Sequence, residues 1–334
     1  MKLLVLGGTG FVSRRIAAEA LARGHDVVCA ARGVHGAPPA GASFVAWDRV
    51  DPVPDGLVAM RPDGVVDVSG TPAHVSRAVA AFPGAHWVFI STLNVYVDES
   101  RPGASADDSA LVAPQADGDP RADPAAYGPM KVACEEAVRA GAEASLVLRP
   151  GLIVGPDDPS GRFAYWPHHA ALAAADGAGL LVPGTPDDPV QFIDVGDLAA
   201  WVVRALETRV SGCLDAIGPS LTRRAFVDGL VAGVGGGAEP VYVPSGVLVD
   251  HGGAEWSGPR SIPLWVADPA ASGFMAREVS ASLRAGLAVR PLADTVRETL
   301  AWLRSTPDAP ITGLTRDEER RLLDDWRHRT AART

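Results

Sequence analysis

The sequence predicts an α/β protein with a doubly wound parallel sheet and a smaller C-terminal lobe. Three observations lead to this fold class. A short apolar strand, residues 3–6, runs directly into a glycine-rich turn. An alanine-rich helical pattern and a second apolar strand follow at once, which is the mononucleotide-binding unit of Rossmann sheets. Further short apolar runs then alternate with helical segments, as parallel strands joined by helices do.

The bulk composition excludes several classes of protein. The 334 residues are enough to bury a full core, in one large domain or two unequal lobes. A formal net charge of −10 argues against nucleic acid or an anionic membrane surface as a partner. The three cysteines show no C-x-x-C spacing, and no apolar stretch is long enough to span a bilayer. We therefore expect a cytoplasmic protein with reduced cysteines.

The later elements follow the same alternation. Expected strands cover residues 27–31, 44–48, 65–70, 86–90, 145–149 and 190–193, and expected helices cover 11–23, 72–82, 126–141, 194–207, 222–233, 291–304 and 315–328. Ligands of such sheets bind at the carboxyl ends of the strands. The predicted domains are a dinucleotide-binding domain (1–154, with 191–218 returning to it), a substrate lobe (155–190 and 222–275) and a C-terminal helical region (276–334).

The glycine turn after the first strand is the predicted cofactor site. Its glycines let the backbone approach a pyrophosphate, which then sits on the amides and the positive dipole end of the next helix. The predicted contacts are Gly7, Thr9, Gly10, Phe11 and Val12. The second strand ends at Ala31 and Arg32 without a carboxylate, and an arginine there can bind a 2′-phosphate. The sequence thus favours NADP(H) over NAD(H), with an exposed loop arginine as the alternative.

A tyrosine and a lysine lie four residues apart at Tyr127 and Lys131. On a helix they share one face, where the cation lowers the pKa of the phenol and makes it a better proton donor and acceptor. A solvated surface pair is the ordinary alternative. However, Lys2 and Lys131 are the only lysines of this arginine-rich chain, so a chance pair is rare. Pro129 is tolerated only in a first turn, which places the helix start near residues 125–127.

Two hydroxyl side chains, Ser91 and Thr92, end the expected fifth strand. The glycine turn, these hydroxyls, the Tyr127–Lys131 pair and the Arg149-Pro150-Gly151 segment occur in an order that resembles the extended short-chain dehydrogenase/reductases. This group is also called the NAD-dependent epimerase/dehydratase family. The resemblance covers the N-terminal two thirds of the chain and implies an NAD(P)-dependent enzyme.

The resemblance also implies a role for each matching residue. Tyr127 would be the general acid/base, and Lys131 would bind the nicotinamide ribose and lower the tyrosine pKa. Thr92 would orient the substrate oxygen, with Ser91 as the substitute, and Asp48 would cap the adenine amino group. Further predicted cofactor contacts at the strand ends are Ser69, Gly70 and Pro150, and the predicted substrate contacts are Ser91, Asn94, Tyr96, Trp166 and Gln191.

Three departures from the family pattern bear on the substrate. Ser13 replaces the third glycine of the turn, which we expect to loosen the packing of helix on strand. Leu152 stands near the place where nucleotide-sugar epimerases often carry asparagine, and Gln191 where they often carry an arginine that holds the diphosphate. The Arg149-Pro150-Gly151 pattern is closer to the carbonyl reductases of the family. We therefore predict an NADP(H)-dependent oxidoreductase that reduces a carbonyl, or oxidises the alcohol, of a small non-nucleotide metabolite.

Two other functions remain open at this point. One is a nucleotide-sugar or related epimerase or dehydratase that uses its bound cofactor only transiently. The other is a non-catalytic dinucleotide sensor or an RNA-binding relative, against which the acidic charge argues. Adjacent His168 and His169 would diverge on a helix, so we predict no metal site. A homodimer is the commonest arrangement of the family.

Overall fold

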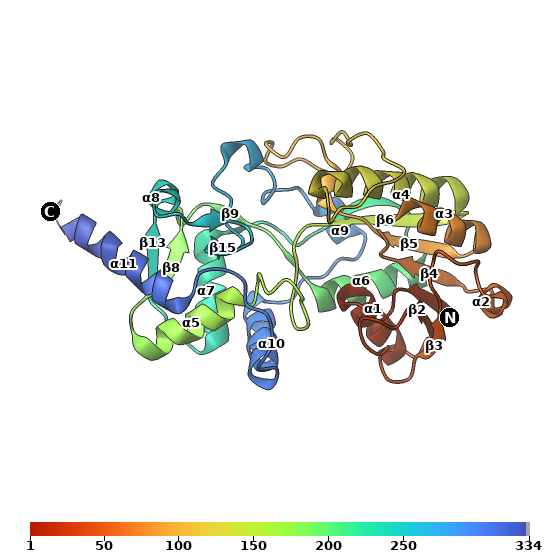
Figure 1. Cartoon of the computed structure of the whole chain (residues 1–334), viewed down its shortest axis with the longest axis horizontal. Helices are drawn as coiled ribbons and strands as arrows, with labels where there is room; N and C mark the ends of the chain where they lie inside the picture. The colour runs from red at the N-terminus through yellow and green to blue at the C-terminus, as the bar shows by residue number, and fades with distance from the viewer. Residues whose placement is uncertain (332–334) are drawn as a thin grey trace.

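The computed structural model describes residues 1–331 and divides into two lobes (Figure 1). The N-terminal lobe is built on a seven-stranded sheet with the order β11-β6-β5-β4-β1-β2-β3. All neighbouring strands of this sheet are parallel. Strand order reverses between β1 and β4, which is the topological switch point where such sheets bind ligands. The predicted doubly wound α/β fold is confirmed.

The strands of this sheet are short and apolar because helices cover both faces. They are β1 (Lys2–Leu6), β2 (Asp26–Ala31), β3 (Ser43–Ala46), β4 (Gly64–Asp67), β5 (His86–Ile90), β6 (Ala144–Pro150) and β11 (Gly212–Ala216). The two central strands β4 and β5 are buried along their whole length. Their carboxyl ends therefore meet inside the molecule.

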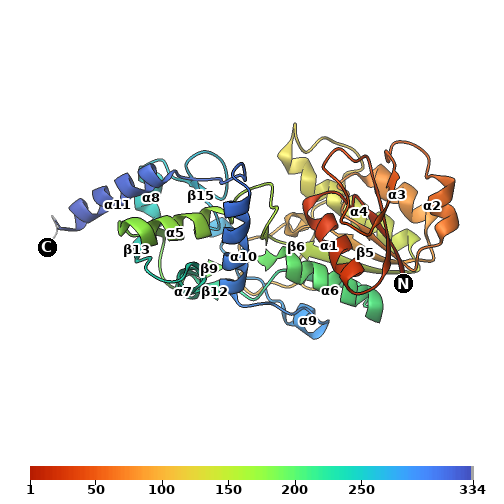
Figure 2. The same cartoon turned by 90° about the horizontal axis from the view of Figure 1, so that it is seen from below.

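Helices form a layer on each face of the sheet (Figure 1), and the view of Figure 2, turned by 90°, looks onto one of these layers. Helices α1 (Phe11–Ala22) and α6 (Val195–Thr208) pack on one face around Ile16 and Trp201. Helices α3 (Pro72–Ala81) and α4 (Tyr127–Gly141) pack on the other face around Val79 and Val138. The short helix α2 (Asp55–Met60) adds Leu57 to the second core.

The second lobe has a separate apolar core, centred on Trp166, Phe226 and Trp265. Its helices are α5 (Tyr165–Asp176), α7 (Arg223–Val234), α8 (Ser245–Asp250), α10 (Leu292–Ser305) and α11 (Arg316–Ala331). Its paired strands are β8 (Leu180–Pro183) with β13 (Pro240–Val243), β9 (Pro189–Val190) with β12 (Leu221–Thr222), and β14 (Ala254–Glu255) with β15 (Ser261–Ile262).

The structure does not show the predicted C-terminal helical region, 276–334, as a separate unit. The helix α9 (Ser280–Arg284) returns to the sheet, where Ser282 donates a hydrogen bond to the carbonyl of Asp215. Helix α10 packs closely on α7, and Leu323 of α11 lies in the core of the second lobe. Both helices belong there because their apolar faces have no other partner. Residues 332–334 lie outside the described part of the chain.

One connection also differs from the sequence-based expectation. The strand expected at 190–193 is two short strands, β9 and β10 (Ile193–Asp194), and β10 pairs with β7 (Ile153–Val154). The acidic segment 98–124 contacts the C-terminal part of the chain, where the amide of Gly103 donates a hydrogen bond to the carbonyl of Ala276. Among residues 1–331, none of the helices combines the length and apolar character needed to cross a membrane.

Candidate active site

The glycine turn joins β1 to α1 in the geometry that a dinucleotide site needs. Gly7 has a φ of +86°, a conformation that side chains disfavour, and its carbonyl accepts the amides of Thr9 and Gly10 at 2.6 and 3.1 Å. Helix α1 then begins at Phe11 without a side-chain cap. Its first amide groups therefore lack helical partners and can bind an anionic ligand.

Ser13 strengthens this turn, which corrects the expectation that it loosens the packing. The side chain is buried, and its hydroxyl donates to the carbonyl of Gly7 at 2.5 Å. The bond ties the first turn of the helix to the end of β1. A serine therefore replaces the usual close packing of glycine with a hydrogen bond.

A cavity of about 660 Å³ opens at the carboxyl ends of β1, β2 and β4. It is lined by seven of the predicted cofactor contacts: Gly7, Thr9, Gly10, Arg32, Asp48, Ser69 and Gly70. Phe11 lines a second cavity next to it, of about 690 Å³. Val12 packs against the core of the sheet and Pro150 is buried in β6, so the structure places their side chains outside both cavities.

Three arginines line the first cavity, two of which sequence reasoning missed. Arg32 is exposed and makes no hydrogen bond or ion pair within residues 1–331. Arg49 donates to both carboxylate oxygens of Asp67, at 2.7 and 2.8 Å. Arg121 comes from the acidic connection before α4. No signal distinguishes Arg49 or Arg121 from the many other arginines of the sequence.

The turn after β4 links this cavity to the tyrosine. Buried Asp67 accepts the amide of Ser69 at 2.9 Å, and the hydroxyl of Ser69 accepts the amide of Thr71. A Cβ added at Gly70 would lie 3.8 Å from the ring of Tyr127. Gly70 therefore borders both the cavity and the tyrosine.

Helix α4 begins at Tyr127, as the position of Pro129 predicts, and lies against the 3-10 turn η1 (Leu93–Val95). A Cβ added at Gly128 would be 2.1 Å from the backbone oxygen of Asn94, so only glycine allows this contact. The hydroxyl of Thr92 donates to the side-chain oxygen of Asn94 at 2.8 Å. The close approach of turn and helix brings Thr92 beside Tyr127.

The phenol of Tyr127 lies beside the hydroxyl of Thr92, close enough for that hydroxyl to affect its pKa. Burial of the phenol group raises the pKa of Tyr127, and the neighbouring Thr92 hydroxyl offsets part of that rise. The residue as a whole keeps 37% of its surface exposed, so solvent limits the effect of burial. The direction is nevertheless upward, which corrects the prediction that the tyrosine pKa is lowered.

Lys131 is not among the groups that shift the pKa of Tyr127, and its own protons are donated to backbone carbonyls. The side chain is 3% exposed, and Nζ donates to the carbonyls of Val68, Ser69 and Ile90 at 3.2, 3.0 and 2.7 Å. Burial lowers the pKa of Lys131 to about 8, against the fields of nearby acidic groups. In this structure Lys131 joins the ends of β4 and β5.

Ser91 and Tyr96, two predicted substrate contacts, are buried in a chain of charged side chains. Ser91 donates to Glu135 at 2.5 Å, and Glu135 pairs with Arg149 at 2.7 Å. Arg149 donates to the phenol oxygen of Tyr96, which itself donates to Asp215 at 2.5 Å. Both predictions are corrected, because these hydroxyls already have protein partners inside the fold.

Gln191 and Trp166 are likewise corrected as substrate contacts. The fully buried amide of Gln191 donates to the carbonyls of Gly218 and Arg277 and accepts the amide of Arg277. The indole of Trp166 is fully buried and donates to the carbonyl of Pro263 at 2.9 Å. Asn94, by contrast, is exposed beside Thr92. Of the five predicted substrate contacts, the structure places Asn94 at the open edge of the site.

The adjacent histidines of α5 have different surroundings. His169 is buried and pairs with Glu319 at 2.5 Å, while His168 is half-buried. Within residues 1–331, no three His, Cys, Asp or Glu side chains gather in a way that could hold a metal ion.

The model of a protein family described as "NAD dependent epimerase/dehydratase family" matches residues 3–214. The chain belongs to this family. The match covers nearly all of the parallel sheet, together with the glycine turn, the end of β5 with its hydroxyl side chains, and helix α4. The protein is therefore an NAD(P)-dependent enzyme of the short-chain dehydrogenase/reductase type.

Individual relatives lead to the same family. The chain is 31% identical over 276 residues to a dTDP-6-deoxy-L-talose 4-dehydrogenase (NAD(P)(+)) of Kitasatospora kifunensis, covering 73% of this chain and 82% of the relative. A UDP-glucuronic acid 4-epimerase of Bacillus cereus in complex with NAD has 15% identity and a TM-score of 0.59, covering 91% and 99% of the two chains. A UDP-glucose 4-epimerase of Thermus thermophilus, also with NAD, has 20% identity and a TM-score of 0.57, covering 91% and 99%. At these identities the two structures show a shared fold.

Proposed function

We propose that this enzyme is an NADP(H)-dependent oxidoreductase that reduces a carbonyl group of a nucleotide-linked sugar. The observation that carries the proposal is the pair of neighbouring hydroxyls, Tyr127 and Thr92, at the carboxyl edge of the sheet beside Gly70. Reduction needs a proton at the carbonyl oxygen as hydride reaches the carbon. A phenol whose pKa is raised stays protonated at neutral pH and can deliver that proton.

The residues around the sheet edge fit a dinucleotide. The uncapped start of α1 suits a pyrophosphate, and the cavity of about 660 Å³ is large enough for an adenosine moiety. When bound, the nicotinamide group supplies the hydride. Thr92 orients the substrate oxygen, Tyr127 holds the proton, and Gly70 keeps the space between tyrosine and cavity free of a side chain.

The preference for NADP(H) rests on the charges around the adenosine end of the cavity. Arg32 is exposed and unpaired within the described chain, and Arg121 lines the same cavity. Asp48 lines the same cavity and carries the opposite charge to these arginines. Its carboxylate accepts the amide of Val50 at 3.2 Å. A planar guanidinium fits a 2′-phosphate with two parallel hydrogen bonds.

The proposed substrate class differs from the non-nucleotide metabolite expected from the sequence. That expectation depended partly on Gln191 standing where a diphosphate is held and partly on the segment Arg149-Pro150-Gly151-Leu152. The first of these grounds falls away because Gln191 is buried and bonded to backbone groups. The relative from Kitasatospora kifunensis is named for oxidising a dTDP-linked deoxysugar. A nucleotide-linked sugar therefore agrees better with both observations. Cytoplasmic location and a homodimer stay predictions.

The test is the substitution Tyr127→Phe, assayed for oxidation of NADPH with dTDP-linked 4-keto sugars. We expect turnover to fall by about 10²–10⁴-fold because the proton donor is lost, while NADPH still binds. Tyr242→Phe, which removes a half-buried hydroxyl from β13 of the other lobe, is the matched control. Full activity of Tyr127→Phe would overturn the assignment of the tyrosine.

A second function, epimerisation or dehydration of a nucleotide-linked sugar, is favoured by the family itself and would use the same residues. It would oxidise and reduce the substrate within one catalytic cycle. Nicotinamide absorbance followed during turnover distinguishes the two. A net change accompanies reduction, whereas epimerisation or dehydration leaves the absorbance constant.

A further inference from the structure

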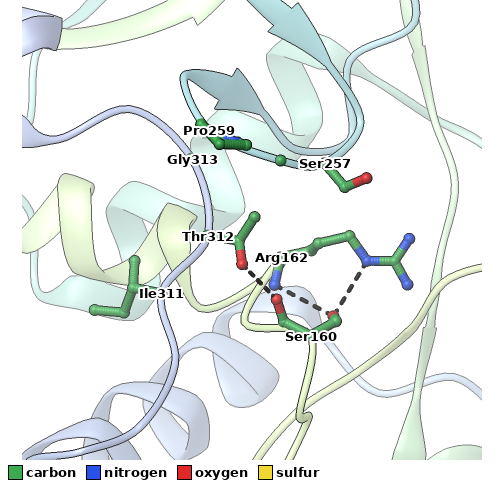
Figure 3. A pocket seen from close by; sticks show the side chains of 8 residues that line it. Ser160, Arg162, Ser257, Pro259, Ile311, Thr312 and Gly313 are labelled. Atoms are coloured by element: carbon green, nitrogen blue, oxygen red, sulfur yellow. Dashed lines mark hydrogen bonds between the residues drawn. The ribbon is translucent and has the colours of Figure 1, made fainter.

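The second lobe contains a cavity of about 610 Å³ whose residues have no role in the reaction described above. Three segments line it: Ser160 with Arg162, residues 257–259, and residues 311–313 (Figure 3). The first segment lies between β7 and α5, the second between β14 and β15, and the third before α11. This hollow is shallow and largely open to solvent, so it suits a charged group of a ligand better than an enclosed apolar one.

The guanidinium of Arg162 is fixed on two sides. Its Nε donates to the hydroxyl of Ser160 at 3.1 Å, and its plane lies over the ring of Trp256, 5.2 Å from the centroid. Ser160 is held in turn, because it donates its hydroxyl to Asp158 at 2.8 Å. The side chain therefore pays little ordering entropy when a ligand binds.

The outer half of the same guanidinium is unused. Within residues 1–331, neither Nη1 nor Nη2 makes a hydrogen bond, and no carboxylate lies within ion-pair distance. Figure 3 shows the guanidinium extending toward the side of the cavity where the hydroxyl of Ser257 lies, away from Ile311. Two parallel N–H groups are thus open toward the cavity.

The charge of Arg162 is only partly compensated. Partial burial lowers the pKa of Arg162, and the field of Asp158 opposes that effect. The carboxylate of Asp158 is itself engaged by the amide and the hydroxyl of Ser160. A cation that has lost some of its water and lacks a paired anion favours an anionic ligand.

The walls of the cavity are held rigidly. Thr312 donates its hydroxyl to the carbonyl of Ser160 at 2.6 Å and its amide to the carbonyl of Gly161 at 3.2 Å. Trp256 and Arg260, which flank the lining residues 257–259 in the chain, have φ values of +65° and +60°. Non-glycine residues persist in this region only where the surrounding structure enforces it, and they cluster at ligand sites.

We propose that Arg162, with Ser257, binds a phosphate of the nucleotide-linked substrate in this cavity. The identity of the substrate rests on the proposed function. The preference for an anion follows from the two unpartnered nitrogens of the Arg162 guanidinium. Two parallel N–H groups match two oxygens of a phosphate, or of a carboxylate, and the hydroxyl of Ser257 adds a third donor. Arg162 would then bind the diphosphate, which nucleotide-sugar epimerases often bind with an arginine at the position of Gln191.

The experiment measures binding of thymidine diphosphate by calorimetry, to the wild type and to Arg162→Met and Arg162→Lys. We expect binding to weaken about 10–100-fold in Arg162→Met, because two charge-assisted hydrogen bonds are lost, and by less in Arg162→Lys. Arg224→Met, which removes an exposed guanidinium from α7 of the same lobe, is the matched control and should bind as the wild type does.

Further measurements separate the possible failures. NADPH binding, followed by fluorescence, should be unchanged in every variant, and thermal unfolding should show each variant folded. Equal affinity of wild type and Arg162→Met for thymidine diphosphate would overturn the proposal, as would no binding to the wild type. A site that binds glucuronate but not thymidine diphosphate or pyrophosphate would overturn the phosphate assignment. None of these results would affect the Tyr127 assay, which tests the proposed function separately.

Discussion

Lys131 and Arg162 are cations of the two lobes that differ in how far the protein satisfies them. All three protons of Lys131 have backbone acceptors at the ends of β4 and β5. Arg162 is held by Ser160 and Trp256, yet two of its nitrogens have no partner in the described chain. Burial alone therefore does not identify a cation that binds a ligand. A cation with spare donors in a cavity is the one available to a ligand.

The same difference extends to the regions around them. The sheet edge is assembled from strand ends that follow one another in the chain, so its residues are recognisable in the sequence. The cavity of the second lobe is assembled from segments near residues 160, 257 and 312, which are far apart in the chain. Perturbing one region should therefore leave the other intact.

The largest expected effect in the sheet region follows from Lys131→Met. Methionine has a similar length but no protons to donate, so three buried carbonyls lose their donor. We expect the free energy of unfolding to fall by about 1–3 kcal/mol, since relief of a buried charge offsets part of the loss. Urea unfolding measures this free energy, and Lys2→Met, at the exposed lysine of β1, is the control. Thymidine diphosphate binding at Arg162 should not change in the folded variant; unaltered stability would contradict the structural role.

The pH dependence of turnover should separate the two regions next. Because burial raises the pKa of Tyr127, the phenol stays protonated through neutral pH. The phenol should then add no inflection to the rate of reduction between pH 7 and 9, while alcohol oxidation should rise about tenfold per pH unit as phenolate forms. Anion binding by Arg162 should change little over this interval, because a guanidinium stays charged. An inflection near neutral pH in the oxidation rate, absent from Tyr127→Phe, would show a lowered phenol pKa instead.

A smaller effect should follow Arg32→Ser in the cofactor cavity. Loss of a charge-assisted contact should weaken NADPH binding about tenfold and leave NADH binding nearly unchanged. Fluorescence titration with both cofactors measures the ratio of the two affinities. Arg121→Ser provides the comparison, because Arg121 lines the same cavity. If only Arg121→Ser lowered the preference for NADPH, the 2′-phosphate contact would belong to Arg121.

The parallel sheet, the glycine turn and the start of α4 were predictable because local patterns specify them. Apolar runs of four or five residues separated by helical segments leave few folds open, and Pro129 limits where its helix begins. The roles of Thr92 and Tyr127 came from the family resemblance and stay predictions, while the structure places the two hydroxyls beside each other. The fit of Gly128 against Asn94 then explains why that placement is possible.

Local sequence patterns were enough to predict the fold class, the family and the strand ends at which ligands of such sheets bind. Which polar side chains are free to bind a ligand became clear from the folded chain. In the folded chain, Lys131 donates its protons to backbone carbonyls. Tyr96 and Gln191 are buried and hydrogen-bonded to other protein groups. Arg162, by contrast, lines a cavity. The physical reason is that a side chain's partners come from segments distant in the chain, which local spacing does not specify.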